Sequence, residues 1–354
     1  MPDVLVVGAG PSGAHAARRC AEKGLDVLIL DAARFPRDKA CGGIVGEPAV
    51  RRIGGDVLSV LEREARVNEL YYDWRRVGRL EAHMYFFKRR RFDHYLVRRA
   101  VAAGARLLEG RRVRAVAVRP DRVVVEADGG THEAPLVIGA DGTNSVVGRA
   151  VGLSHRDGPW KYASVRAEID LPPDRMEALG IEDPAPHQRT YFFSDLVGFA
   201  WIVPNRGSVN AGLGATVRHA GGLRERFHAF LRRLGLPPAD VRGGQIPYRP
   251  LPRVYADRVL LTGDAGGFVD PWTGCGIDEG IEASERAAEV ARLAVDRGDF
   301  TANTLRQFQD ASRDHLRWIH RRGRWVQAVD LAMPVGARFP FWVREVVRVA
   351  ARLT

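Results

Sequence analysis

Cysteine and long apolar runs are scarce in this chain of 354 residues. The three cysteines, Cys20, Cys41 and Cys275, are too few for a disulfide framework and fit a reducing compartment. No apolar run reaches the length of about 18 residues that a membrane-spanning helix needs. The first apolar segment begins at residue 4, which leaves no room for a signal peptide ahead of it. These features predict a cytoplasmic protein.

Lysine is also rare, although the chain is strongly basic. Only four of the 54 Lys and Arg residues are lysine, and the net charge is +11. Three interpretations are open: a GC-rich genome that favours arginine codons, attraction to an anionic lipid surface, and attraction to a phosphorylated substrate. No recognised nucleic-acid-binding motif accompanies the charge, so we expect no nucleic-acid partner. No His and Cys residues have metal-ligand spacing, so we expect no metal site.

Glycine is concentrated near the beginning of the chain. Val4–Val7 is a short apolar run of the kind that forms an interior parallel strand. Gly8-Ala9-Gly10-Pro11-Ser12-Gly13 follows, and a helix is expected from Ala14 to about Lys23. Gly8, Gly10 and Gly13 allow a tight turn and a close approach of backbone to a pyrophosphate, which the free N–H groups of the helix N-terminus can bind. The whole turn, Ser12 included, is predicted to bind the phosphates of a dinucleotide.

Two later features extend this pattern. A second apolar strand, Val27–Leu30, ends at Asp31, whose carboxylate can accept hydrogen bonds from a ribose. Another glycine-rich segment, Gly263–Gly267, lies about 250 residues after the first, with Asp141-Gly142 between them. Together these segments predict one long cofactor bound by both ends of the chain, and that cofactor is FAD.

The remaining pattern indicates an α/β protein with two closely joined domains. Residues 1–150 and 251–300 are predicted to form a discontinuous, Rossmann-like FAD-binding domain. Residues 151–250 carry alternating, strand-like stretches and predict an inserted, largely antiparallel β-sheet substrate domain. Residues 36–90 look irregular, and about 40–90 are expected to face the substrate in part. Residues 301–354 are predicted to form a short helical C-terminus.

Five landmarks occur in an order that one group of flavoproteins shares. They are the glycine turn with Asp31, the segment P-R-x-K-x-C-G-G at 36–43, Arg89-x-x-Phe92-Asp93, Asp141-Gly142, and the stretch from Gly263 to Ile277. On these landmarks, over about the first 300 residues, the chain resembles the para-hydroxybenzoate-hydroxylase-like FAD superfamily. Within it, the chain is most similar to the geranylgeranyl reductase family. The segment at 36–43 is the most specific of the five and the glycine turn is the least.

The resemblance implies a set of residues at the cofactor. Gly276 and Ile277 would bring backbone N–H groups to the pyrimidine edge of the flavin, where they favour the anionic reduced ring. Asp141 would support FAD indirectly, and a simple strand-ending turn is the alternative. All the residues implied at the cofactor are Arg37, Cys41, Gly42, Arg89, Val113, Asp141, Asp264, Gly276 and Ile277.

Cys41 is the catalytic candidate. In the resembling family this cysteine lies near the flavin ring and beside the substrate pocket. Its thiol could therefore donate or relay the proton that accompanies hydride delivery to an alkene. The alternative is a packing residue, since unliganded cysteines are usually buried and inert.

The substrate side is indicated by Gly198-Phe199-Ala200-Trp201-Ile202-Val203-Pro204, which resembles a strand of the same family. Phe199 and Trp201 alternate along this strand and therefore share one face, where they could line an apolar cavity. Tyr191, Phe192 and Phe193 are expected to extend the same wall. Packing in the protein core is the alternative for these aromatic residues. The sequence thus predicts an apolar small molecule or prenyl lipid as substrate.

The C-terminus departs from the family, whose members usually carry a longer segment that closes the lipid cavity. Residues 338–353 are expected to form a short helix with Arg344, Arg348 and Arg352 on one face. Docking onto the protein's own domain is the first interpretation of this helix, and peripheral contact with an anionic membrane is the second. The short tail weakens the expectation that a C20 chain is fully enclosed.

We therefore predict an FAD-dependent oxidoreductase that reduces C=C bonds of a prenyl or other apolar unsaturated substrate. The alternative is an FAD-dependent monooxygenase or, less in keeping with the motifs, a halogenase acting on an apolar or aromatic secondary metabolite. A non-catalytic FAD-bearing protein is a third hypothesis that nothing in the sequence recommends. No second glycine fingerprint marks an NAD(P)H domain. The electron donor is left open among NAD(P)H, an electron-donor protein and free reduced flavin.

Overall fold

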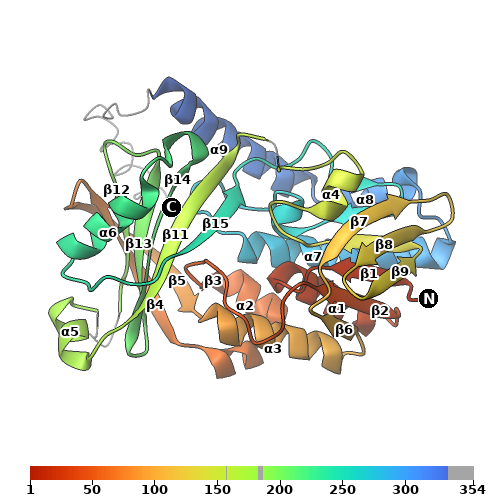
Figure 1. Ribbon diagram of the computed structural model, residues 1–354, viewed down its shortest axis with the longest axis horizontal. Coiled ribbons are helices and arrows are strands. Elements are labelled where there is room, and N and C mark those ends of the chain that lie inside the picture. Colours follow the sequence, from red (N-terminus) through yellow and green to blue (C-terminus); the bar gives the residue numbers. More distant parts are fainter. Residues whose placement is uncertain (157, 182–185, 334–354) are drawn as a thin grey trace.

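Two large sheets organise the fold of the protein. Its structure is a computed structural model that describes residues 1–333 except 157 and 182–185 (Figure 1). The first sheet has the strand order β16-β17-β10-β1-β2-β6 and is parallel except at β16. Its strands are β1 (Val4–Val7), β2 (Val27–Asp31), β6 (Arg106–Glu109), β10 (Leu136–Gly139), β16 (Tyr255–Ala256) and β17 (Val259–Leu261).

The two faces of this sheet are covered by different layers. Side chains of β1 alternate between them: Val4 and Val6 pack against helices, whereas Leu5 and Val7 pack against a small antiparallel sheet. Burial on both faces explains why this strand is apolar at every position. The helices are α1 (Pro11–Glu22), α3 (Arg89–Ala102) and α7 (Ile277–Arg297), and the small sheet contains β7 (Val113–Val118), β8 (Val123–Ala127) and β9 (Gly130–Ala134).

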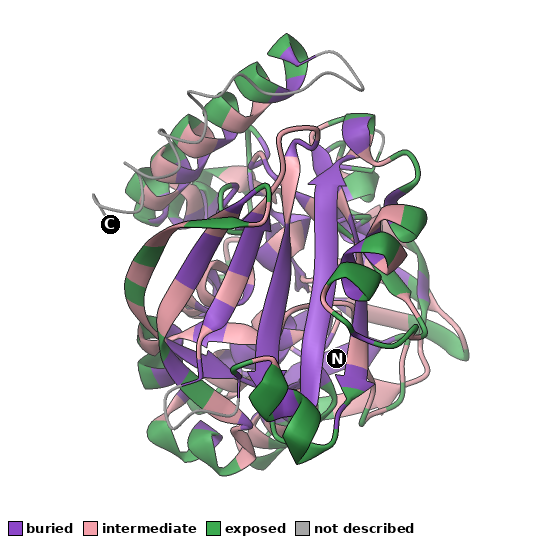
Figure 2. Cartoon of the chain, turned by 90° about the vertical axis from the view of Figure 1, so that its left-hand side faces the viewer, coloured by how far each residue is buried: buried purple, intermediate pink, exposed green. Residues whose placement is uncertain are grey.

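The second large sheet has eight strands and is antiparallel except where β12 pairs with β4. Figure 2 shows its middle strands buried along their length. Helix α6 (Leu223–Arg233) covers one face through Phe227 and Phe230. In spatial order the strands are β15 (Arg242–Pro247), β11 (Lys161–Asp170), β14 (Ser208–Thr216), β13 (Gly198–Asn205), β12 (Gln188–Phe192), β4 (Arg63–Tyr72), β5 (Arg75–Phe86) and β3 (Ile44–Gly46).

The α/β class, the Rossmann-like sheet and the largely antiparallel second sheet are confirmed. The prediction that residues 36–90 are irregular is wrong, because this segment contributes β3, β4 and β5 to the second sheet. That sheet therefore extends beyond the predicted insertion at 151–250. That residues 40–90 face the substrate in part is still a prediction. Strands β4 and β5 carry charged residues at many positions, so the apolar alternation that reveals a strand is weak in them.

The shorter elements and the C-terminal helices connect and cover these sheets. Helix α9 crosses the top of the molecule in Figure 1, on the opposite side from α3. The predicted helix at 338–353 lies outside the described residues. These elements are α2 (Glu47–Ile53), η1 (Gly55–Val60), α4 (Val146–Ala150), α5 (Pro173–Ala178), η2 (Val217–His219), η3 (Gly263–Ala265), α8 (Ala302–Ala311) and α9 (Arg313–Ala332).

Candidate functional site

The glycine turn, Gly8–Gly13, joins β1 to α1 with its backbone tightly folded. Gly8 has φ +94°, and a Cβ at Gly13 would lie 1.8 Å from the carbonyl oxygen of Gly8. At Gly10 the situation differs, since a Cβ there would meet only the Arg37 guanidinium, at 3.9 Å. Gly10 is the N-cap of α1, and it makes no side-chain capping bond. The first N–H groups of α1 are therefore available to an anion that approaches Gly10.

Asp31 fixes the glycine turn to the end of β2. Its Oδ2 accepts a hydrogen bond from the Ala9 N–H at 2.6 Å, and its Oδ1 accepts one from the Ala33 N–H at 2.7 Å. The residue is only 9 % exposed. A carboxylate offers about four acceptor positions, so capacity is left for a ribose hydroxyl. Contact with the ribose is still a prediction for Asp31.

The second glycine-rich segment lies directly against the first. The Ser12 hydroxyl would be 2.4 Å from a Cβ at Gly263 and 2.1 Å from a Cβ at Gly280. The absence of side chains at these two positions therefore lets α1 pack closely against η3 and α7. Gly276 is the N-cap of α7 and, like Gly10, makes no side-chain capping bond. The structure thus brings the N-termini of α1 and α7 to one region of the molecule.

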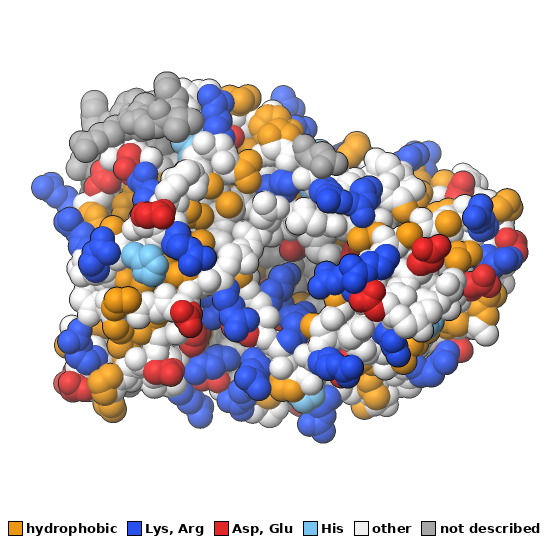
Figure 3. All heavy atoms as spheres, in the orientation of Figure 1, with side chains coloured by type: hydrophobic (Ala, Val, Ile, Leu, Met, Phe, Trp, Pro, Cys, Tyr) orange, Lys and Arg blue, Asp and Glu red, His pale blue; other side chains and the backbone are white. Residues whose placement is uncertain are grey.

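Asp264 connects this region to the 36–43 loop, which runs from Pro36 to Gly43. Its Oδ1 would lie 3.1 Å from a Cβ at Gly276, and its Oδ2 lies 3.8 Å from the Lys39 Nζ. Gly10 is similarly close to Arg37, at the other end of the same loop. The predicted residues Gly10, Arg37, Asp264 and Gly276 therefore surround one space. Figure 3 shows a hollow between the two halves of the molecule with Lys and Arg side chains around it.

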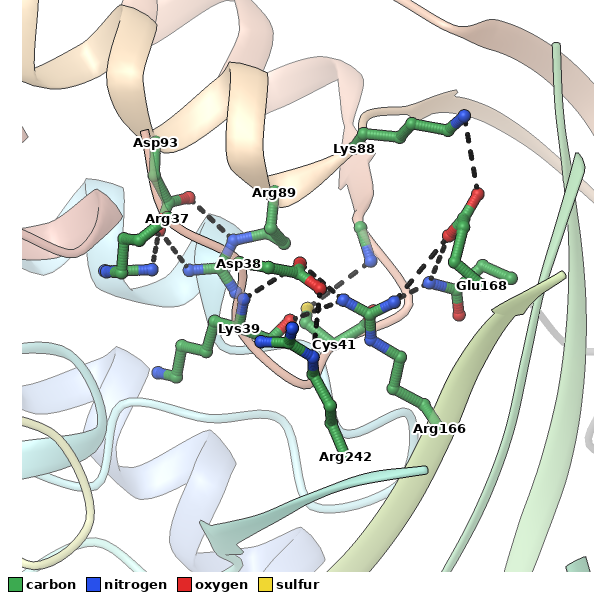
Figure 4. Close-up of polar contacts among 12 residues, drawn as sticks. Arg37, Asp38, Lys39, Cys41, Lys88, Arg89, Asp93, Arg166, Glu168 and Arg242 are labelled. Atoms are coloured by element: carbon green, nitrogen blue, oxygen red, sulfur yellow. Dashed lines mark hydrogen bonds and ion pairs between the residues drawn. The ribbon is translucent and has the colours of Figure 1, made fainter. Parts of the chain in front are cut away.

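A buried ion-pair cluster holds the loop on the side of the first sheet (Figure 4). Arg89 donates to both carboxylate oxygens of Asp93, at 2.6 and 2.7 Å, and Arg37 donates to Asp93 Oδ2 at 2.7 Å. Burial disfavours the charge of Arg89, but the Asp93 carboxylate outweighs burial and raises the guanidinium pKa. Burial likewise disfavours the charged form of Asp93, but the Arg89 guanidinium outweighs burial and lowers the pKa of the Asp93 carboxyl. Both groups are therefore charged and each depends on the other.

The second sheet holds the loop from its other side. Arg166, on β11, forms an ion pair with Asp38 at 2.5 Å and donates to the carbonyl of Lys39 at 3.1 Å. Asn210, on β14, donates from Nδ2 to the carbonyl of Cys41 at 3.1 Å. The Oδ1 of Asn210 accepts from the indole N–H of Trp201 at 2.9 Å. One amide therefore positions Trp201 relative to the backbone of Cys41.

Phe199 and Trp201 share one face of β13, as predicted, in a cluster with Met84 and Phe86. The Trp201 ring lies over Gly212, and a Cβ at Gly212 would come within 2.0 Å of the ring. The tip of the Phe199 ring would lie 3.8 Å from a Cβ at Gly274, in the turn before α7. This aromatic face of the second sheet therefore meets the beginning of α7.

Tyr191 does not extend this wall, and that prediction is wrong. It pairs with Ala200 on β13, not with Phe199, so its side chain lies on the opposite face of the sheet. There it stacks on Tyr71 at 4.6 Å between ring centroids and packs against Phe230 of α6. Phe193 packs against Trp74 and Phe230 on that same face, so the prediction is wrong for it too. Phe192 pairs with Phe199 and lies on the predicted face.

Asp141 and Val113 have local structural roles in this structure. The Asp141 carboxylate accepts from the Ser145 hydroxyl at 2.5 Å and from the Val146 N–H at 2.6 Å, so it holds the turn before α4. Burial raises the pKa of Asp141. Val113 begins β7 and packs among the buried residues of the small sheet. Indirect support of FAD by Asp141 and an adenine-side contact of Val113 are still predictions.

Asp278, in the first turn of α7, was missed by the sequence analysis. Its carboxylate oxygens accept from the N–H of Gly46 at 2.9 and 3.1 Å, which ties α7 to β3 and α2. Burial, with a smaller contribution from Glu279, raises the pKa of Asp278 to about 6. An Asp in the first turn of a helix is common as a capping residue, so its type gave no signal. In the described ranges no three His, Cys, Asp or Glu residues are grouped to hold a metal ion.

A dinucleotide cofactor fits three features of this region: two helix N-termini that are each capped by a glycine, the Asp31 carboxylate at the end of β2, and open space next to Gly10. Residues 1–194 match the family described as FAD binding domain. The chain belongs to this family and is an FAD-dependent oxidoreductase. Within it, the chain belongs to the geranylgeranyl reductase family, because it is 33 % identical over 337 residues to digeranylgeranylglycerophospholipid reductase 1 of Methanopyrus kandleri. That alignment covers 89 % of this chain and 87 % of the relative.

Two further proteins are similar to this chain, one in sequence and one in structure. A probable electron transfer flavoprotein-quinone oxidoreductase of Escherichia coli is 28 % identical to this chain, in an alignment that covers 87 % of this chain and 80 % of the relative. The crystal structure of a geranylgeranyl bacteriochlorophyll reductase-like protein of Thermoplasma acidophilum superimposes with a TM-score of 0.81 at 22 % identity. It covers 93 % of this chain and 87 % of that chain, and at this identity it supports the fold.

Proposed function

We propose that the protein reduces C=C bonds of a prenyl lipid or another apolar unsaturated molecule. The observation that supports this most strongly is the junction of the two sheets. There Phe199 and Trp201 present an apolar face to the turn before α7, and Asn210 links Trp201 to the backbone of Cys41. An apolar chain placed against this face would lie near the backbone of Cys41 and the predicted position of the flavin.

Bound and reduced FAD supplies the hydride that one alkene carbon receives. The residues of the chain do the rest. The N-terminus of α1 binds the pyrophosphate, Asp31 binds the ribose, and the N–H groups at Gly276 and Ile277 stabilise negative charge on the ring. Phe199 and Trp201 exclude water from the reacting carbons.

Cys41 would supply the proton to the second alkene carbon, and water would restore the thiol proton. The substrate would thus gain two hydrogens and two electrons. An external donor must return those electrons, and we propose NAD(P)H or an electron-donor protein for this step.

The reaction is tested under argon with chemically reduced, FAD-loaded protein and a geranylgeranyl lipid. We expect flavin oxidation together with a product that is heavier by two hydrogens, detected by mass spectrometry. A product that contains oxygen and forms only in air would instead assign the protein to the monooxygenases. Flavin that stays reduced with every unsaturated substrate, in air and under argon, would contradict both assignments.

Cys41→Ser tests the proton donor, because a hydroxyl is a much weaker acid than a thiol. We expect the rate of substrate reduction to fall about 10² to 10⁴-fold, the usual contribution of general acid catalysis. FAD content, read from the ratio of visible to ultraviolet absorbance, should stay at the wild-type level. An unchanged rate with normal FAD content would make Cys41 a packing residue.

A further inference from the structure

Exposed apolar side chains are concentrated on the second half of α9. Seven large hydrophobic residues are exposed in the described part of the chain, and Trp325, Val329 and Leu331 are three of them, at 64, 37 and 54 %. A fourth, Trp272, is 44 % exposed and lies next to α9, because the Arg322 guanidinium stacks on its ring at 4.8 Å. We call Trp272, Trp325 and Val329 the α9 patch, because Trp325 and Val329 are four residues apart and share one side of the helix. Leu331 comes two residues after Val329 and therefore lies on a different side.

The orientation of α9 is fixed, so the patch must face outward. Leu316 and Ile319 are buried against the body of the protein, and a Cβ at Gly323 would lie 2.4 Å from the Tyr248 carbonyl oxygen. The buried carboxylate of Asp330 accepts a hydrogen bond from Tyr248 at 3.3 Å and a second one from Thr216. These contacts hold the far end of the helix.

The exposed face of α9 is basic over the turns that precede the patch. Arg313, Arg317, Arg321 and Arg324 are all exposed and follow one another at intervals of three or four residues, which places them on one side of the helix. Arg313 and Arg317 form exposed pairs with nearby aspartates. Arg321 and Arg324 form no ion pair with any residue that the structure describes.

We propose that the α9 patch and its four arginines dock the protein on an anionic lipid bilayer. Tryptophan is favoured at the boundary between headgroups and acyl chains, and arginines next to it attract anionic headgroups. A second copy of the chain would bring the same basic face against itself. The following segment, 334–354, contains four arginines and one glutamate, so its charge does not complement this face either.

The patch also adjoins the candidate site. Arg322 donates to both carboxylate oxygens of Asp270, at 3.0 and 2.9 Å, and Asp270 begins the loop that leads to Gly276. A bilayer on this face would therefore lie close to the loop that precedes α7. The docking surface itself rests on the exposure and charge of α9 and does not depend on the proposed reaction. No helix in the described residues is long and apolar enough to cross a membrane.

Co-sedimentation of the FAD-loaded full chain with lipid vesicles tests the proposal. We expect binding to vesicles made of equal parts phosphatidylcholine and phosphatidylglycerol, and much weaker binding to phosphatidylcholine alone. Trp325→Ser should weaken binding about tenfold. Arg321→Ser and Arg324→Ser should each weaken it about fivefold, and added salt should weaken the wild type.

Matched controls lie on α3, on the opposite side of the molecule. Val101→Ser and Arg98→Ser remove one exposed apolar and one exposed basic side chain and should leave vesicle binding unchanged. FAD content is measured for every variant to show that it is folded. No binding to anionic vesicles, or equal effects of the α3 and α9 variants, would overturn the proposal. A wild-type dimer in analytical ultracentrifugation that Trp325→Ser dissociates would assign the patch to a second copy instead.

Discussion

The glycine turn at Gly8–Gly13 contains no charged side chain, whereas the 36–43 loop on the facing side of the site is held by charged and amide side chains from three elements. The turn keeps its shape through backbone contacts, such as the one between Gly13 and the carbonyl of Gly8. The loop keeps its shape because Asp93 of α3, Arg166 of β11 and Asn210 of β14 bind it.

This difference has an energetic consequence. A turn shaped by its backbone excludes a side chain only where the backbone folds on itself, as at Gly13, and it accepts one where there is space, as at Gly10. A loop held by buried charges is instead sensitive to substitutions outside the loop, because removal of one distant partner leaves another charge buried and unpaired. The two parts of the site should therefore respond differently to substitution.

The largest effect is expected from Asp93→Ala. Arg89 is 4 % exposed, and the substitution would leave its guanidinium buried without a carboxylate. We expect the free energy of unfolding, measured by urea denaturation, to fall by about 3 to 5 kcal/mol. Asp128→Ala is the control: it removes a similar pair of hydrogen bonds with Arg114 at the surface and should change the free energy of unfolding little. Equal losses in the two variants would show that the 36–43 loop does not depend on buried charge.

An intermediate effect is expected from Asp278, which joins the start of α7 to β3. Its pKa in the folded chain is about 6, above the value of 3.8 for an unperturbed Asp. Between these values the unfolded chain ionises first, so the folded state loses stability as pH rises from about 4 to 6. The loss from this group is at most about 3 kcal/mol.

Asp278→Asn removes this titration, and the unfolding free energy should depend less on pH between about 4 and 6 than in the wild type. Asp174→Asn, in the first turn of α5, is the matched control and should keep the wild-type dependence. Urea denaturation across this pH range measures both. Parallel pH profiles of the unfolding free energy for wild type and Asp278→Asn would show that the titration of Asp278 does not affect stability.

The smallest effect on stability is expected from Gly10→Ala in the glycine turn. The new methyl group meets only the end of the Arg37 side chain, at 3.9 Å, and Gly10 has a negative φ. The apoprotein should therefore change by less than about 1 kcal/mol. FAD affinity, measured by fluorescence titration, should still fall about tenfold or more, because the methyl occupies the approach to α1.

Gly221→Ala, which also has open space around it, is the control and should bind FAD normally. A normal FAD affinity in Gly10→Ala would mean that the cofactor does not approach the turn at this glycine. That result would mean that the glycine turn does not contribute to FAD binding through the open space at Gly10.

The same contrast explains how much could be predicted from the sequence. The glycine turn, Asp31 and the start of α7 were predictable, because each depends on a few consecutive residues whose spacing carries the signal. The partners of the 36–43 loop were not, because Arg166 and Asn210 lie more than 120 residues away and reach it only through the register of the second sheet.

Tyr191 shows how register decides such cases. Phe199 and Trp201 were assigned to one face correctly, since two residues on one strand share a face at a spacing of two. The face of Tyr191 depends on which β13 residue it opposes, and that residue is Ala200. Its neighbour Phe192 opposes Phe199, so a shift of one residue reverses the assignment.

The order of the strands also constrains how this protein is made. The first sheet needs β17 at residues 259–261 to pair with β10, and the second needs β12 at 188–192 to join β4. During synthesis, early strands such as β1 and β4 therefore emerge from the ribosome long before their last partners. Neither sheet can be completed until most of the chain has been translated. The N-terminus of α7, which is proposed to contact the cofactor, is translated later still, because α7 begins only at Ile277.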